Sequence, residues 1–228
     1  MGLSRTRDAR GVVTFTFDDA PTRNALGSTV LADLDRALAG VAEDAGVRVV
    51  VFTGAGTTFS SGADRSELDD PAAVAAATSL LASILERIEA SPVPVVARVN
   101  GAAYGAGLAI AAAADISVAT ADGFFGLPEV RFGLVAGPAA AACVGRLGPT
   151  AALDFLLTGR RFDADEAVGL FTAVVPRAQL DAVVERRVAD LVDGDYRALA
   201  ATRRLVRRMA RPDLAERLKL AAEVAAGR

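Results

Sequence analysis

Short apolar runs alternate with apolar residues at helical spacing along the first half of this chain. The runs are rich in β-branched residues and bounded by turn formers, which predicts strands at residues 12–17, 47–53, 94–99 and 116–119. The segments between them carry a helical apolar stripe, which predicts helices at residues 28–44, 71–90 and 108–114. Ser28 is the expected N-cap of the first helix, and Pro92 ends the second. The repeated order of strand and helix indicates an α/β layer architecture.

The second half of the chain is mainly helical. Helices are expected at residues 138–147, 149–157, 164–169, 180–192 and 196–211, with a short strand at 171–175. No linker separates the two halves. We therefore expect an α/β core over residues 1–175 and a C-terminal helical region over 176–228 that packs on the core or on a neighbouring subunit.

Composition and charge limit the classes of function. The chain has 228 residues, 52% hydrophobic and 23% charged, which is enough for the core of one globular domain. Its net charge of −3 gives no general attraction to nucleic acid or to an anionic membrane. No signal peptide is visible, and no segment of about 18 uncharged apolar residues lacks a glycine or proline. We expect a cytoplasmic protein without nucleic-acid or membrane partners.

A local basic run lies near the end of the chain. A solvated helix face is its simplest interpretation. It consists of Arg203, Arg204, Arg207, Arg208 and Arg211.

The absence of histidine excludes several kinds of catalytic site. Without His, neither a Ser-His or Cys-His relay nor a His-ligated metal can form. Cys143 is the single cysteine, so the chain has no internal disulfide and no site with several thiolates. We expect no metal.

Two glycine-broken turns offer backbone amides for catalysis. They read FSSGADRSEL over residues 59–68 and NGAAYGAGLAIAAAAD over 100–115, and each leads from an apolar strand into a helix. Such turns can aim free N–H groups at an oxygen, and the amides of Ala63 and Ala106 are the candidates. The short Gly-Ala-Gly sequence at 105–107 is explained equally well by close packing of helix on strand. Motifs for dinucleotides and for phosphate loops are absent.

Glu129 is the candidate acid–base group. It follows Pro128 within an apolar stretch, and such surroundings raise the pKa of a carboxyl group towards the range of a useful base. An exposed turn residue or an acid at a helix N-terminus is the alternative interpretation.

Taken together and in order, five segments resemble the crotonase superfamily, the enoyl-CoA hydratase and isomerase family. They are PTRNAL, VVFTGAGTTFSSGAD, PVPVVARVNGAAYGAGLAIAAAAD, FGLPEVRFGLVAG and LLTGRRFDADEAVGLFTAVVP, and the resemblance extends from about Asp18 to Val175. It implies a crotonase-like superhelix of repeated ββα units, and a C-terminal helical trimerisation region that gives a homotrimer or a hexamer.

The resemblance also implies a substrate and its contacts. An acyl-CoA thioester is expected, with its carbonyl held by the amides of Ala63 and Ala106 and with no cofactor other than the coenzyme A of the substrate. Contacts to coenzyme A would come from Arg23, Ala25, Ser61, Asp64 and Arg65.

The sequence departs from the family pattern at its best-known acid. Hydratases of this family carry a first glutamate at the position that matches Ala109, whereas Glu129 matches the second and is retained. One carboxylate is enough to move a double bond, so a Δ3 to Δ2 isomerase is favoured. The alternatives are a hydratase, decarboxylase or hydrolase on the same scaffold and a catalytically silent acyl-CoA binder. Candidate replacements for the missing acid are Asp64, Glu67, Asp69 and Tyr104.

Two further differences affect the expected acyl pocket. The glycine-rich segment usual after FGLVAG reads PAAAAC at residues 138–143, so we expect a shifted helix N-terminus. Many relatives continue beyond the point where this sequence ends at AAEVAAGR, which leads us to expect a more open acyl site.

Overall fold

The largest element of the computed structural model, which describes residues 2–210, 218–219 and 222–223, is a six-stranded sheet. All neighbouring strands in it are parallel except the first pair. In spatial order the strands are β1 (Leu3–Arg7), β2 (Val12–Phe17), β4 (Val49–Gly54), β7 (Val95–Val99), β9 (Ile116–Thr120) and β12 (Ala173–Val175).

Two smaller sheets stand beside the large one. One contains β11 (Arg161–Asp163), β10 (Phe124–Gly126), β8 (Ala102–Tyr104) and β5 (Thr58–Ser60), and the other pairs β3 (Ala25–Leu26) with β6 (Gly62–Ala63). The helices are α1 (Ser28–Glu43), α2 (Pro71–Ala90), α3 (Gly105–Ala113), α4 (Gly137–Thr158), α5 (Leu180–Asp193) and α6 (Tyr196–Ala210). Short 3-10 helices are η1 (Arg65–Glu67), η2 (Pro128–Phe132) and η3 (Arg177–Gln179).

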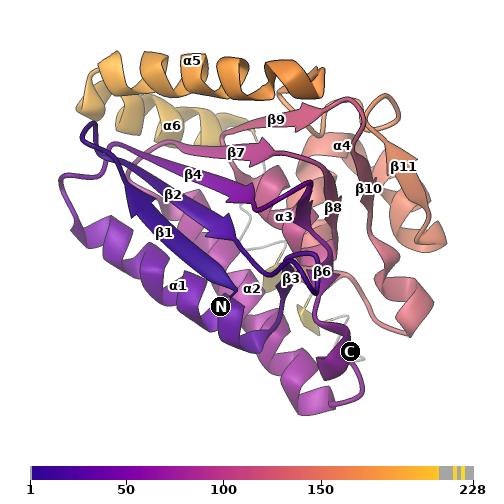
Figure 1. Ribbon diagram of the computed structural model, residues 1–228. Coiled ribbons are helices and arrows are strands. Elements are labelled where there is room, and N and C mark those ends of the chain that lie inside the picture. Colours follow the sequence, from indigo (N-terminus) through magenta and orange to yellow (C-terminus); the bar gives the residue numbers. More distant parts are fainter. Residues whose placement is uncertain (1, 211–217, 220–221, 224–228) are drawn as a thin grey trace.

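The same unit recurs four times along the chain. Each unit places one strand in the six-stranded sheet and the next in a smaller sheet, and then adds a helix: β2-β3-α1, β4-β5-α2, β7-β8-α3 and β9-β10-α4 (Figure 1). The predicted architecture of repeated ββα units is therefore present. Because every unit turns between its second strand and its helix, these turns gather in one region.

The central strands of the six-stranded sheet, β2, β4, β7 and β9, are buried on both faces. In β2, Phe15 belongs to the core shared with α1 to α4, whereas Val12 faces the other way and packs with α5. In β4, Phe52 and Val51 divide in the same manner. This two-residue period with apolar side chains on both faces is typical of parallel strands covered by helices. The C-terminal helices α5 and α6 thus pack on the core of their own chain; packing on a neighbouring subunit stays a prediction.

Several local predictions were wrong. Residues 164–169 form turns and not a helix, and the exposed strand β1 was missed because it lacks an apolar run. Ser28 is the first residue of α1 and not its cap. Gly27 occupies the N-cap position, and the Glu67 carboxylate accepts hydrogen bonds from the backbone N–H and hydroxyl of Ser28. The break expected between the helices at 138–147 and 149–157 is confirmed, because Gly148 has a non-helical φ of +75° and ψ of +164° and forms a kink within α4.

The basic run is only partly a solvated face. Arg203 is buried, bonds to the Asp115 carboxylate and donates to carbonyls at the end of α2, including that of Glu89. Arg207 also bonds to Asp115. Arg204 is exposed as expected. The side chains of Arg208 and Arg211 lie outside the described residues.

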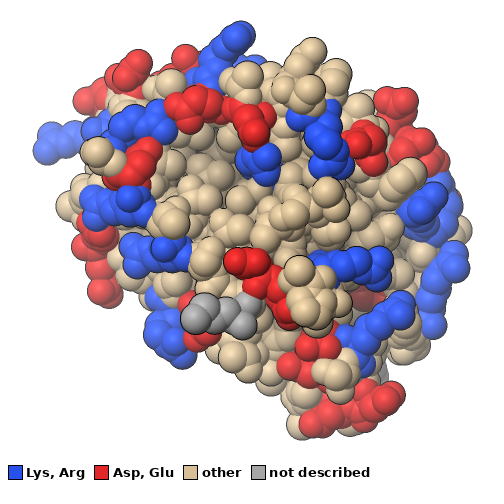
Figure 2. Space-filling view, viewed as in Figure 1, with Lys and Arg blue, Asp and Glu red and all other residues tan. Residues whose placement is uncertain are grey.

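Surface charge is mixed on the face seen in Figure 2. Basic and acidic side chains alternate around its rim, and uncharged residues line the hollow at its centre (Figure 2). Such a face presents no large field of a single sign.

Two helices, α2 and α4, have the length and mean hydropathy of a membrane span. This is weak evidence, because core helices of soluble proteins pass the same test. In the fold α2 packs on α1, and α4 packs on α3. The expected lack of a membrane partner stays a prediction.

Candidate active site

The two glycine turns found in the sequence lie against each other. Gly62 has a φ of +88° and Gly105 a φ of +48°, a left-handed region that favours glycine. A Cβ on Gly62 would be 3.0 Å from the backbone oxygen of Tyr104, and one on Gly105 would be 3.9 Å from Cα of Gly62. Glycine at position 62 is therefore required for the close approach of the two turns, and the positive φ favours glycine at position 105 as well.

The predicted amide donors flank this contact. Ala63 follows Gly62 in β6 and is exposed to the cleft described below. Ala106 is the second residue of α3 and is 8% exposed, while its neighbour Gly105 lines the cleft. N–H groups in the first turn of a helix have no acceptor within that helix, and they lie at the positive end of its dipole. This arrangement suits an oxygen that becomes negative.

Gly107 has a packing role. A Cβ on Gly107 would lie 2.5 Å from Cβ of Ser60, so α3 can rest on β5 only with glycine at this position. The Ser60 hydroxyl donates to the backbone oxygen of Asn24 and accepts from the N–H of Gly62. The two glycines of Gly-Ala-Gly thus have different roles. Gly107 allows α3 to pack on β5, and Gly105 allows the turn to lie close to the side chains of the site.

Glu129 lies next to this turn. It is half-buried in the first turn of η2, and its Oε1 is 2.9 Å from the position of a Cβ on Gly105. Its Oε2 is shielded from solvent and has no hydrogen-bond partner. Loss of hydration raises the pKa of this carboxyl group to about 7. The group can therefore both accept and return a proton near neutral pH, and an exposed turn residue is excluded.

A cleft of about 550 Å³ connects these groups. Its walls come from the loop before β3, the turn around β6 and η1, the turn from β8 into α3, and η2. All five residues predicted to contact coenzyme A line it: Arg23, Ala25, Ser61, Asp64 and Arg65.

Asn24 holds the loop at one end of the cleft, a role that the sequence reasoning missed. Arg23 and Asn24 both have positive φ, and the buried side-chain amide of Asn24 donates to the backbone oxygens of Ala55 and Thr58. Ser61 ties the loop down from the other side, because its N–H donates to the oxygen of Arg23. Asn tolerates the left-handed region, which was the available signal in PTRNAL.

Asn100 makes a matching set of bonds from the second glycine turn. Its Oδ1 accepts from the N–H of Gly54, and its Nδ2 donates to the oxygen of Gly56. The turn between β4 and β5 is thus held by two buried asparagines, one just before β3 and one just before β8.

The sequence model of the family described as enoyl-CoA hydratase/isomerase matches residues 7–226. The chain belongs to the enoyl-CoA hydratase/isomerase family. It is 35% identical over 182 residues to a protein of Mycobacterium bovis named as a probable enoyl-CoA hydratase, covering 74% of this chain and 64% of that protein. It is 34% identical over 205 residues to the mouse mitochondrial enoyl-CoA hydratase domain-containing protein 3, covering 87% of this chain and 68% of that protein. The chain therefore spans about two thirds of the length of these relatives.

A solved structure supports the same assignment. The enoyl-CoA hydratase of Mycobacterium smegmatis superposes with a TM-score of 0.88 at 31% identity, over 100% of this chain and 90% of that one. The human enoyl-CoA hydratase domain-containing protein 3 superposes with a TM-score of 0.86 at 26% identity, over 99% of this chain and 90% of that one. The predicted crotonase-like fold is confirmed.

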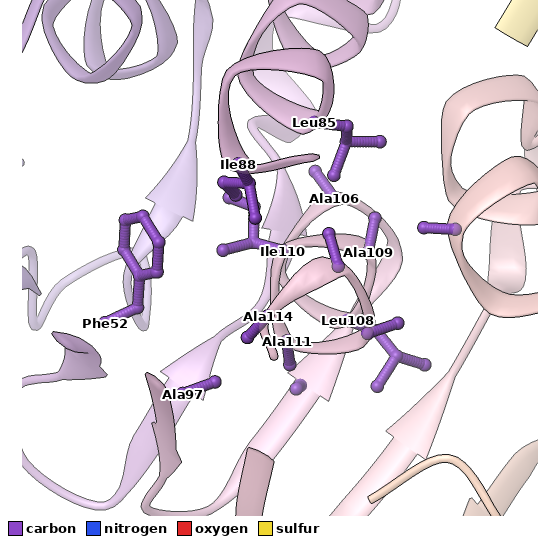
Figure 3. Close-up of a cluster of buried hydrophobic side chains, with 14 of the residues drawn as sticks. Phe52, Leu85, Ile88, Ala97, Ala106, Leu108, Ala109, Ile110, Ala111 and Ala114 are labelled. Carbon is purple, nitrogen blue, oxygen red and sulfur yellow. The ribbon is translucent and has the colours of Figure 1, made fainter. Parts of the chain in front are cut away.

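Ala109 stands at the position where the hydratases of this family are expected to carry their first glutamate. Ala109 is fully buried on α3, in a hydrophobic cluster that includes Leu85 and Leu108 (Figure 3). It does not line the cleft. No group at this position can transfer a proton.

The four candidate replacements differ in position. Asp64 lines the cleft, but its carboxylate accepts from the N–H and hydroxyl of Ser66. Glu67 is held by Ser28, and Asp69 is exposed and away from the lining. Tyr104 also lines the cleft. Its ring packs against Gly126, since a Cβ added to Gly126 would lie 2.9 Å from Cδ1 of Tyr104. Glu129 therefore differs from Asp64, the other carboxyl group of the lining, in having a buried oxygen without a hydrogen-bond partner.

Two other predictions concern residues near the site. PAAAAC forms the first turns of α4, which begins at Gly137. Among the described residues, no group of three or more Asp, Glu or Cys side chains is placed to hold a metal ion.

Proposed function

We propose that this chain is an acyl-CoA enzyme that moves a carbon–carbon double bond through a thioester enolate. The observation that carries the proposal is the state of Glu129, whose carboxyl group has a pKa raised to about 7 and one oxygen without a partner. It stands beside the Gly105 turn, while Ala109 offers no second acid.

The reaction needs one base and one oxyanion site. Glu129 as carboxylate removes a proton from C2 of a 3-enoyl thioester, and the electron pair moves into the thioester carbonyl to give an enolate. The amides of Ala63 and Ala106 hold the negative oxygen. Glu129, now protonated, returns the proton to C4 as the carbonyl reforms, and the double bond lies between C2 and C3. The atoms balance without a cofactor, water or metal.

We assign coenzyme A to the end of the cleft formed by the loop before β3, opposite to the end that carries Glu129. Arg23 presents a guanidinium at the rim, which suits a phosphate. Ala25, Ser61, Asp64 and Arg65 line the path from this loop to the two amides. A charged nucleotide at the rim and a thioester between the turns would match the distribution of charged and backbone groups.

Hydration is the second candidate function. It is favoured by the relatives, since the proteins of Mycobacterium bovis and Mycobacterium smegmatis are named as enoyl-CoA hydratases. With Glu129 alone, water would have to be activated and the proton delivered by the same carboxyl group.

Turnover of two substrates distinguishes these functions. Purified protein is incubated with a 3-enoyl-CoA and with a 2-enoyl-CoA, and the products are separated by chromatography. We expect conversion of 3-enoyl to 2-enoyl-CoA and at least a 10²-fold fall in Glu129→Gln. Glu86→Gln is the control, because Glu86 is an exposed glutamate on α2. Hydration of 2-enoyl-CoA with no conversion of 3-enoyl-CoA contradicts the isomerase, and binding of both without reaction indicates a silent acyl-CoA binder. Decarboxylation or hydrolysis would release carbon dioxide or free coenzyme A.

A homotrimer or a dimer of trimers, and a place in the cytoplasm, are part of the same proposal. Light scattering after size-exclusion chromatography measures the mass of the assembly. A monomer would contradict the predicted trimerisation region.

A further inference from the structure

One buried side chain contacts both segments that carry the proposed oxyanion amides. Ser60 is the last residue of β5 and is fully buried. Its hydroxyl accepts a hydrogen bond at 3.1 Å from the N–H of Gly62, the residue before Ala63. Its Cβ lies 2.5 Å from the position of a Cβ on Gly107, the residue after Ala106. The Ser60 side chain thus touches the sequence neighbour of each amide donor.

The Ser60 hydroxyl uses its hydrogen atom as well as its lone pairs. It donates at 2.8 Å to the backbone oxygen of Asn24, in the loop assigned to coenzyme A. A hydroxyl has one hydrogen to donate, so this bond leaves the lone pairs of the oxygen for Gly62. Buried polar groups need such partners, and removal of the hydroxyl takes one hydrogen bond from each backbone group. A single side chain therefore ties the loop before β3 to the turn of Ala63.

Gly62 needs an anchor of this kind. Glycine has the widest choice of backbone conformations, and Gly62 has a φ of +88°. Its own φ and ψ set the direction of the next N–H, which belongs to Ala63. The hydrogen bond to Ser60 fixes the N–H of Gly62, and the parallel pairing of Gly62 with Ala25 in β3 holds the turn from the other side. Without the hydroxyl, the turn loses one of these two anchors.

Small rotations matter because both donors have to meet one oxygen. An oxyanion donor acts when it lies about 2.7–3.1 Å from the position of the negative oxygen. Two amides from separate turns meet this condition only if their spacing is fixed, and Ser60 lies at the contact between their segments. The described lining of the cleft includes Gly62 and Ala63 but not Ser60. The effect of Ser60 on a reaction therefore passes through the backbone and not through the substrate.

We propose that Ser60 is the positioning residue of the oxyanion site, which fixes the directions of the Ala63 and Ala106 amides relative to each other. This inference rests on the proposed function, because that function places the thioester oxygen between the two amides. The hydrogen bond to Gly62 controls the first amide, and the contact with Gly107 keeps α3 and the second amide at a fixed distance. Loss of the hydroxyl should weaken the hold on the negative oxygen and leave binding of the neutral thioester nearly unchanged.

A 3-oxoacyl thioester tests the oxyanion site apart from turnover. The C2 proton of 3-oxohexanoyl-CoA is acidic, and the enolate formed when this proton is lost to the buffer absorbs in the ultraviolet. Absorbance at saturating ligand and constant pH therefore measures the ratio of bound enolate to bound keto form, which well-directed amides raise. We expect this ratio to fall by about tenfold in Ser60→Ala. The fall is smaller than the loss of about 10²-fold for a reacting group displaced by about 1 Å, because the Ala63 amide is loosened and not removed.

Steady-state kinetics with a 3-enoyl-CoA provide a second readout. We expect kcat to fall by about tenfold in Ser60→Ala with little change in KM, as for an interaction made only in the transition state. Ser60→Cys keeps a weaker donor and acceptor at the same place, so it should recover part of the kcat and of the enolate ratio. It also provides both measurements if Ser60→Ala does not fold.

Ser91→Ala is the matched control. The Ser91 hydroxyl also donates to one backbone oxygen and accepts from one backbone N–H, both of Val93, and this serine lies outside the lining of the cleft. We expect a lower Tm in both alanine variants. Ser91→Ala alone should keep the enolate ratio and the kcat of the unchanged protein.

An enolate ratio in Ser60→Ala equal to that of the unchanged protein would overturn the inference and leave Ser60 with a structural role only. A rise in KM without a change in kcat would also overturn it, and would assign the serine to the loop that binds coenzyme A. If the unchanged protein forms the enolate but does not isomerise a 3-enoyl-CoA, the proposed function is refuted and the inference stands. If it binds 3-oxohexanoyl-CoA without forming the enolate, or does not bind it, the oxyanion site itself is wrong and both fall.

Discussion

The contact between Gly105 and Glu129 can be tested with a single methyl group. In Gly105→Ala, the new Cβ would lie 2.9 Å from Oε1 of Glu129, about half an ångström inside an ordinary contact. The carboxylate has to move away from the turn that carries the amides. A misplacement of about 1 Å in a reacting group costs about 10²-fold in rate, so this smaller shift should lower kcat/KM by about tenfold.

The backbone adds a separate effect on stability. Alanine at a φ of +48° costs about 1 kcal/mol, which in a chain of this size lowers the Tm by about 2–4 °C. Gly56→Ala is the matched control, because Gly56 has a φ of +68° and open space around its Cβ position. It should lose a similar amount of stability and keep its activity.

Steady-state kinetics with a 3-enoyl-CoA and thermal unfolding of both variants provide the two measurements. The ratio of their kcat/KM values isolates the contact with Glu129 from the strain that both share. If Gly105→Ala and Gly56→Ala have the same kcat/KM, Glu129 does not act from the position described, and the reasoning is refuted.

Two further predictions concern pH and the buried arginine. Because the pKa of Glu129 is raised from 4.5 to about 7, the folded state holds this proton more tightly than the unfolded chain; the stability that it contributes is complete below about pH 4.5 and is lost as the pH rises through about 7. The Tm of Glu129→Gln minus the Tm of the unchanged protein should therefore be larger at about pH 8 than at about pH 5. Thermal unfolding measures both values, and a difference that does not change with pH would contradict this prediction. Arg203→Met leaves the Asp115 carboxylate with one arginine fewer and should lower the free energy of unfolding in urea by about 3 kcal/mol, whereas the exposed Arg204→Met should change it by at most about 0.5 kcal/mol. Equal free energies of unfolding for the two arginine variants would show that the buried pair of Arg203 and Asp115 does not stabilise the fold more than an exposed arginine does.

The regular elements of the core were predictable because their apolar periods are strong. Helix α2 has the predicted bounds, and β2 matches residue for residue. The short strands β3, β6 and β8 were not predicted, since two or three residues carry no period and their pairing depends on distant segments. The same limit explains the wrong helix at residues 164–169, where alanine and acidic residues favour a helix locally but the chain forms turns.

The site was predictable in its parts and not in its contacts. Ala63, Ala106 and Glu129 were named from glycine turns and from a carboxylate after proline, and the structure brings their segments together. What no pattern supplied was the 2.9 Å approach of Gly105 to Glu129 or the buried amides of Asn24 and Asn100. These depend on tertiary packing, as does the burial of Arg203, whose partner Asp115 is 88 positions away in sequence.

The asparagine bonds divide the cleft into a fixed wall and an adjustable one. Asn24 and Asn100 use both donors and acceptors of their amides, so aspartate or serine cannot replace either without leaving a buried carbonyl unpaired. Within the described part of the chain, the wall formed by η2 lacks such a double anchor, because Arg131 is tied to α4 by a single side-chain hydrogen bond, from its Nε to the backbone oxygen of Thr158. Substitutions that change which acyl chain is accepted should therefore be tolerated on η2 and rejected around the asparagines, so that variation in substrate can accumulate on one side while the geometry of the thioester site is preserved on the other.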